Sequence, residues 1–167
     1  MRYVLLTCLA LSLSACGFTP MYGTAFDSQQ SASVKATLAQ IHIDNIPDRE
    51  GQYLRNALID RFYTTGRPAN ARYDLQIQKI EEVVNDLDIT KSSNATRGQL
   101  TINTSMALKD KQTGEIVLTR ALSSSTSYNI LTSEFANRVS ENNTRRNALD
   151  DLAAQIELQI GLFLKQK

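Results

Sequence analysis

The chain has 167 residues, in which 18 Lys and Arg balance 17 Asp and Glu, with two Cys, one His and no Trp. This charge balance gives no reason to expect nucleic acid or a broad anionic surface as a partner. No Cys/His cluster has metal-ligand spacing, and the sequence contains no phosphate-binding glycine loop and no nucleophile elbow. The composition therefore favours a binding or structural protein over an enzyme, and we expect no metal.

The first fifteen residues have the pattern of an export signal. A basic residue, Arg2, is followed by an apolar run over residues 4–13 and by small residues just before Cys16. A run this short does not cross a bilayer core, which requires roughly 20 residues. We therefore expect residues 1–15 to be cleaved as a lipoprotein signal peptide.

Cys16 is the expected lipidation site. The segment Leu13-Ser14-Ala15-Cys16 closely resembles the bacterial lipobox, in which the cysteine is lipidated and becomes the new N-terminus. The alternative is a plain secretory signal with a coincidental cysteine. On the lipobox interpretation Cys8 leaves with the signal, so the mature protein has no disulfide and no free thiol. The covalent lipid on Cys16 is the one attached group we expect, with no other cofactor.

The mature chain divides into a tether and one domain. Residues 16–33 form the lipidated N-terminus and a tether, because their Ser/Gln/Ala stretch lacks apolar periodicity. Residues 34–167 are predicted to form a single α+β sandwich domain, long enough to bury a core.

The domain is expected to begin with a short strand and an amphipathic helix. The strand carries Leu38, Ile41 and Ile43, and Pro47 opens the next element. Over residues 48–63, apolar residues recur every four positions, which predicts a helix with one buried stripe. The stripe comprises Leu54, Leu58 and Phe62.

Three strands are predicted next. Alternation over residues 73–77 continues to Val84 with a phase slip near Lys79, which indicates a bulge. Residues 85–98 form a polar hairpin loop or strand tip. Strands over 100–108 and 116–128 then form an antiparallel hairpin with a turn at 111–114.

The C-terminal segment completes the fold. Apolar spacings of three and four predict a helix over 133–165, frayed or kinked at Asn142-Asn143. A right-handed crossover makes the first two strands parallel, and the hairpins make the others antiparallel. The expected fold is therefore α+β: a two-layer sandwich of two α-helices on a four-stranded mixed β-sheet, in the order β-α-β-β-β-α.

The second face of the predicted sheet lacks the charges of an ordinary solvated face. Such a face usually carries Lys and Glu, which also prevent edge pairing. One interpretation is that this face lies against another polar wall, such as the interior of a membrane β-barrel; the other is a merely Ser/Thr-rich solvated sheet. The face comprises Thr101, Asn103, Ser105, Ala107, Val117, Thr119, Ala121, Ser123, Ser125 and Ser127.

Few residues are candidates for catalysis or for binding a metal or phosphate. His42 alternates with apolar neighbours and is interpreted as a strand surface residue rather than a catalytic base. The segment 86–90 resembles the start of a calcium loop, but Lys91 replaces the turn glycine and Arg97 the terminal glutamate. Lys91 and Arg97 at the strand tip, with Lys109 and Lys111 in the next turn, are basic side chains of the kind that bind phosphate.

The segment Cys16-Gly17-Phe18-Thr19-Pro20-Met21-Tyr22-Gly23 resembles the mature N-terminus of the LPS-assembly lipoprotein (LptE) family of alphaproteobacterial type. The segments 135–137 and 145–149 are also similar to the family's last helix. The resemblance implies an outer-membrane lipoprotein, lipid-anchored on the periplasmic side, that plugs the β-barrel of the LPS translocon and helps it assemble. It also implies binding of lipopolysaccharide, for which it suggests Lys91 and Arg97.

Two other hypotheses remain open. A lipid-anchored interaction domain of another cell-envelope complex would share the anchor and the fold. A lipid-tethered periplasmic hydrolase would require catalytic work from Asp86, Asp88 or His42.

Overall fold

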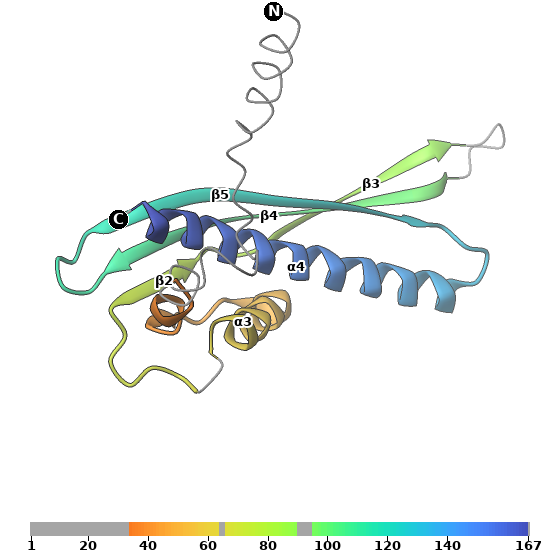
Figure 1. The fold of residues 1–167 in the computed structure, drawn as a ribbon. Helices are drawn as coiled ribbons and strands as arrows, with labels where there is room; N and C mark the ends of the chain where they lie inside the picture. The colour runs from red at the N-terminus through yellow and green to blue at the C-terminus, as the bar shows by residue number, and fades with distance from the viewer. Residues whose placement is uncertain (1–33, 64–65, 90–94, 167) are drawn as a thin grey trace, which may run out of the picture. The chain divides into compact units, whose positions relative to one another are not determined.

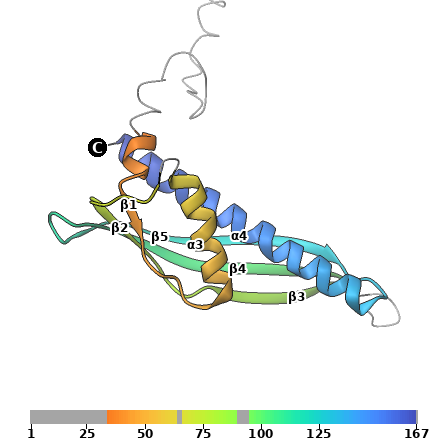
Figure 2. The same cartoon turned by 90° about the horizontal axis from the view of Figure 1, so that it is seen from below.

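Two helices lie on one side of a twisted mixed sheet (Figures 1 and 2). The computed structural model describes residues 34–63, 66–89 and 95–166. The predicted signal peptide, Cys16, the tether and Lys91 lie outside the described residues. The predicted fold class, a two-layer α+β sandwich, is confirmed.

The first strand is shorter than predicted. Leu38 ends a helical turn over residues 34–38, and strand β1 covers only Ile41–Ile43. The prediction that Leu38 belongs to the strand was wrong, because an apolar residue buried beside a strand has the same sequence signature whether its backbone is extended or helical. Helix α3 follows over Asp48–Phe62, and its predicted stripe is buried.

The predicted second strand is divided into β2, Tyr73–Ile77, and β3, Glu81–Ile89. Both pair antiparallel with β4, which covers Ala95–Asp110, and β2 also pairs in parallel with β1. Between them, residues 78–80 stand opposite residues 104–105. The extra residue is the bulge predicted near Lys79, and it divides one extended segment into two strands on the same side of β4.

Strand β5, Ile116–Asn129, pairs antiparallel with β4 on the other side. The register shifts at Leu108/Lys109, so that Leu118 faces Leu108 whereas Ile116 faces Lys109. Because of this shift Val117 packs against the core, and Ile116 is 59% exposed. Including Val117 in the polar face was therefore wrong, since strict alternation does not anticipate an irregularity at a strand start.

Helix α4 extends without interruption over Glu134–Lys165. The side chain of Ser133 caps it by accepting a hydrogen bond from the Ala136 N–H at 3.4 Å. The predicted fraying at the two asparagines does not occur. Asn142 instead accepts a hydrogen bond from Arg145 at 3.0 Å, and Thr144, the residue after the two asparagines, is buried.

The core lies between the helix layer and the inner face of the sheet. Each fully buried Leu or Ile contributes about 1.5–3 kcal/mol. Helix α3 lies over β1 and β2, whereas α4 extends along β5 past the end of α3 (Figure 2). In the distal half of the sheet, where β3 and the first half of β4 lie, Arg145 of α4 contacts Glu82 of β3, and Val84 of β3 is 48% exposed. The helix residues of the core include Leu54, Leu58, Phe62, Leu149, Leu152, Ile156 and Ile160.

Candidate functional site

The helix-free face of the sheet gathers small, uncharged side chains from β4 and β5. Register pairs these residues across the two strands: Thr101 with Ser125, Asn103 with Ser123, Ser105 with Ala121, and Ala107 with Thr119. The β5 members are exposed and the β4 members are half-buried. The predicted polar face is thus a continuous surface, which we call the hydroxyl face and define by these eight residues.

The eight residues of the hydroxyl face carry no charge, and charged residues flank them: Glu81 of β3 is in register with Asn103 beside the middle of the face. Thr101 Oγ1 and Ser125 Oγ are 3.1 Å apart, so hydroxyls of neighbouring strands hydrogen-bond to one another. Lys109 lies in register with Asp74 at one end, and Arg97 lies at the other. A surface of this kind is smooth, can donate and accept hydrogen bonds, and presents no buried charge to a partner.

The structure describes one of the two tip residues predicted to bind LPS. Arg97 is exposed near the start of β4, in register with Leu87 on β3 and Asn129 on β5. Lys91 lies outside the described residues, so the two are not brought together here. In the opposite turn, Lys111 Nζ is 3.3 Å from Asp74 Oδ1, which makes it an ion-pair partner within the fold.

A charged clasp holds α4 onto the distal half of the sheet. The Nε of Arg145 donates to both carboxylate oxygens of Glu82 on β3 at 2.9 and 3.0 Å, and its Nη2 donates to Glu141 at 2.7 Å. Burial by itself lowers the pKa of Arg145, but the hydrogen bonds to Glu141 and Glu82 outweigh it and raise the pKa above its ordinary value. Arg145 is therefore permanently charged and ties helix to strand.

Beside the clasp, Tyr128 of β5 lies over Gly98 of β4. A Cβ at Gly98 would be 2.6 Å from Cζ of the Tyr128 ring, which is closer than real Cβ contacts come. Burial raises the pKa of Tyr128, and the nearby Glu141 and Asp86 raise it further. The glycine therefore makes room for an aromatic ring at the distal end.

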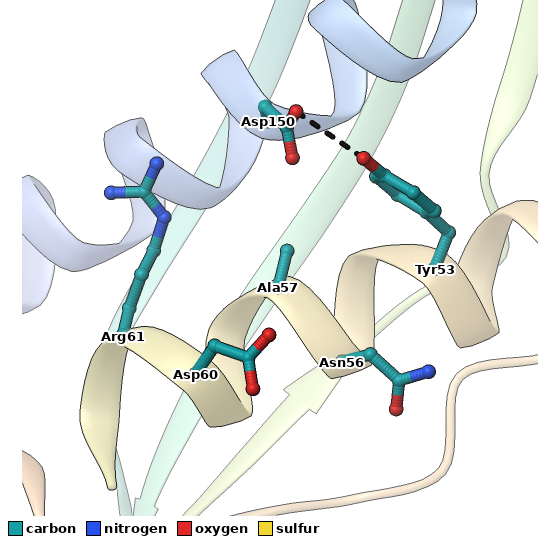
Figure 3. A pocket seen from close by; sticks show the side chains of 6 residues that line it. All are labelled: Tyr53, Asn56, Ala57, Asp60, Arg61 and Asp150. Atoms are coloured by element: carbon teal, nitrogen blue, oxygen red, sulfur yellow. Dashed lines mark hydrogen bonds between the residues drawn. The ribbon is translucent and has the colours of Figure 1, made fainter. Parts of the chain in front are cut away.

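A surface cleft of about 570 Å³ lies along α3 where it meets Asp150 of α4 (Figure 3). At one end the Tyr53 hydroxyl donates to Asp150 Oδ2 at 3.3 Å, and near the other end Arg61 pairs with Glu157 at 3.1 Å. Burial raises the pKa of Tyr53, and the charge and hydrogen bond of Asp150 add to the increase. These contacts join the two helices.

His42, the histidine weighed as a catalytic base, is a surface residue of its strand, as predicted. His42 lies on β1 with Nε2 3.5 Å from Asp44 Oδ1, and its side chain is 51% exposed. Within residues 34–63, 66–89 and 95–166, no group of three His, Cys, Asp or Glu is placed to hold a metal ion. In the same residues, no helix combines the length and apolarity needed to cross a bilayer.

Two features of the site were missed at the level of sequence. Arg145 lies four residues before the buried Leu149, so its charge is on the face of α4 that packs against the core. A charged residue on that face indicates that it has an ion-pair partner. Gly98 interrupts a strand, which signals close approach of another group. In both cases the partner, Glu82 or Tyr128, comes from a different element, which sequence spacing does not reveal.

Solved structures share the fold. A candidate lipoprotein from Caulobacter crescentus has a TM-score of 0.62 at 22% identity, covering 81% of this chain and 98% of that one. The minor lipoprotein of Acinetobacter baumannii has a TM-score of 0.55 at 23% identity, with 73% and 90% covered. The rare lipoprotein B of Shewanella oneidensis has a TM-score of 0.54 at 11% identity, with 71% and 89% covered. No curated protein matches the chain.

A family model for lipopolysaccharide assembly, LptE, matches residues 38–160. The match starts after residues 16–23, so it is independent of the N-terminal segment that first suggested this family. It covers the sandwich from the helical turn before β1 to the last turns of α4. The chain therefore belongs to the LptE family of lipopolysaccharide-assembly proteins.

Proposed function

We propose that this protein is a non-enzymatic outer-membrane lipoprotein that plugs the β-barrel of the LPS translocon, helps that barrel assemble and binds lipopolysaccharide. The observation that carries the proposal is the hydroxyl face. The interior of a membrane β-barrel is polar. A plug inside it needs a surface that hydrogen-bonds widely and presents no charge that the barrel wall would have to desolvate.

The anchor follows from Cys16. One acyl chain gives only marginal membrane binding, and stable anchoring takes more than one. The lipoprotein modification that the lipobox resembles supplies three chains, which would keep the domain at the periplasmic side of the outer membrane. The tether, residues 16–33, would then separate the membrane surface from the first described residue, Val34.

Lipopolysaccharide binding is assigned to the basic end of the sheet. Arg97 is exposed beside the hydroxyl face, and an arginine binds phosphate through a bidentate fork. Lys91, six residues before Arg97 in the sequence, is proposed as the second basic residue that binds phosphate. A phosphorylated glycolipid bound at this end would contact the plug without crossing the hydroxyl face.

The test is affinity purification of the C-terminally tagged chain from detergent-solubilised outer membranes, with quantification of the copurifying proteins. We expect one large β-barrel in near-equal amount. The variant Thr101→Arg/Ser105→Arg places charge on the central strand of the hydroxyl face and should reduce barrel recovery. Asn56→Arg/Asn147→Arg adds the same two charges at exposed positions of α3 and α4 and serves as the matched control.

Two outcomes would contradict the proposal. Equal barrel recovery with the face variant and the control would show that the hydroxyl face does not meet the barrel. Recovery of a different envelope complex, without any barrel, would select the interaction-domain hypothesis instead.

A further inference from the structure

The outer edge of β5 is a long row of backbone groups that no other strand pairs, although side chains of Gln155 and Arg120 donate to the carbonyls of Ser123 and Thr119. Within the part of the chain that the structure describes, β5 pairs with β4 alone, so its other edge is open. The strand has 14 residues, whereas strands commonly have about 5–6. An open edge of this length is a template for pairing with another chain.

Two hydrogen bonds show which residues point outward. Ile130 N, at an even position, donates to Thr96 O across the hairpin at 3.0 Å. Ser123 O, at an odd position, accepts from the Gln155 side chain of α4 at 3.1 Å. Because backbone groups alternate along a strand, the odd residues of β5 direct their N–H and C=O groups to the open edge. These residues are Thr119, Ala121, Ser123, Ser125 and Ser127.

The edges of this sheet are protected unequally. At the other side β1 has three residues, and β3 carries the acidic residues Glu81, Glu82 and Asp86. Short strands and charged side chains are the usual protection against edge pairing. Along β5, Arg120 is the one charged residue, and the strand contains no proline. The open edge thus lacks protection where β3 has it.

An exposed apolar pair lies beside that edge. Leu158 and Leu162 of α4 are 40% and 42% exposed. Their spacing of three and seven residues from Gln155 places them on the flank of α4 that carries Gln155, the side chain that reaches the β5 edge. The flank that borders the open edge is therefore apolar as well as unoccupied by any described residue of the chain.

We propose that β5 accepts an extended segment of the partner barrel protein as an additional strand. The segment would be uncharged, with apolar side chains toward α4 and small or hydroxylated ones on the opposite side, continuous with the hydroxyl face. Because a closed barrel has no free strand edge, the segment belongs to a loop or another non-barrel part of that protein. This inference rests on the proposed function for the identity of the partner.

Residue-resolved hydrogen exchange tests the pairing. Amides of the odd residues 121–127 of β5 should exchange at least roughly tenfold more slowly in the purified barrel complex than in the isolated chain in the same detergent. Amides of even residues, already bonded to β4, should change little. This two-residue period distinguishes strand pairing from simple burial, which slows both sets.

Two variants test the same edge in another way. Ser127→Pro, at an exposed position outside the hydroxyl face, removes an outward N–H that the fold does not use, whereas Ser127→Ala keeps that N–H. Barrel recovery should fall with proline and not with alanine. If Ser127→Pro fails to fold, Leu158→Gln/Leu162→Gln tests the apolar flank. Its control is Phe135→Gln, because the Phe135 side chain is 78% exposed at the far end of α4.

Four results would overturn the inference. Odd amides that stay unprotected while the barrel copurifies would eliminate edge pairing and leave the proposed function intact. Uniform slowing of odd and even amides would indicate burial alone. Protection of odd amides in the isolated chain, with a doubled mass, would identify a second copy as the occupant. A preparation without any barrel would overturn both proposals.

Discussion

Gly98 shows how one missing Cβ shapes the distal end of the sheet. In Gly98→Ala, the new methyl group meets the ring of Tyr128 at 2.6 Å, so the ring or the strand has to move. Overpacking of this kind costs about 1–3 kcal/mol. We expect the free energy of unfolding to fall by that amount in urea denaturation. Ser127→Ala, at an exposed neighbouring position, should change it by less than about 0.5 kcal/mol.

A second substitution checks the cause of that loss. Tyr128→Leu removes the ring atoms that the Gly98 methyl group would meet, so combining it with Gly98→Ala should give less than the sum of the two single losses. Additive losses would show that strain at Gly98 arises elsewhere. The sequence did not indicate this contact, because Gly98 was predicted to lie in a hairpin loop or strand tip, and Gly98 meets Tyr128 only when β4 and β5 pair.

Arg97 provides a residue-level test of lipopolysaccharide binding. Arg97→Glu replaces a phosphate-binding fork with a repelling carboxylate, so the purified chain should bind immobilised lipopolysaccharide more weakly. Because Arg97 is exposed, the thermal midpoint should change little. Arg138→Glu is the control, since Arg138 is exposed on α4 and pairs with Glu134 within its own helix. Equal binding by both variants would remove Arg97 from the site.

At the scale of elements, the Arg145 clasp joins α4 to β3. The guanidinium and the Glu82 carboxylate are only 19% and 25% exposed, so removing either leaves a poorly hydrated charge. Arg145→Met and Glu82→Gln should each cost roughly 2 kcal/mol, with a coupling of about 1 kcal/mol in the double-mutant cycle. The exposed pair Arg138–Glu134 should show coupling below about 0.5 kcal/mol. A clasp coupling as small as that would contradict the role of Arg145.

Element positions were predictable where one periodicity covers the whole element. The buried stripe of α3 and the alternation over residues 100–108 satisfy this condition and agree with the structure. The strands themselves extend further than predicted, since β3 ends at Ile89 and β4 begins at Ala95, inside the segment predicted as a hairpin loop or strand tip. Errors fall where a periodicity ends: Leu38 belongs to a helical turn, and Val117 lies at the register shift of β5. At such points backbone pairing, which no local pattern encodes, decides on which face a side chain lies.

For the whole molecule, the hydroxyl face was predictable because it follows from alternation along β4 and β5. The open edge of β5 was not predictable, because whether a strand lies at an edge depends on the order of the strands in the sheet. Here the bulge at residues 78–80 places both β2 and β3 on one side of β4. One edge of β4 therefore pairs with two strands, β2 and β3, and its other edge pairs with β5. That asymmetry leaves the face and the edge contiguous on β5.

The proposed attachment of the whole molecule to a membrane depends on Cys16. Cys16→Ala removes the sulfur that would carry the lipid. We expect an unprocessed precursor that is absent from the outer-membrane fraction, measured by membrane fractionation and immunoblotting. Cys8→Ala, within the predicted signal, keeps the lipidation site and should fractionate normally. If Cys16→Ala still reached the outer membrane, the domain would have to be held there by its partner, and the barrel rather than the lipid would determine its location.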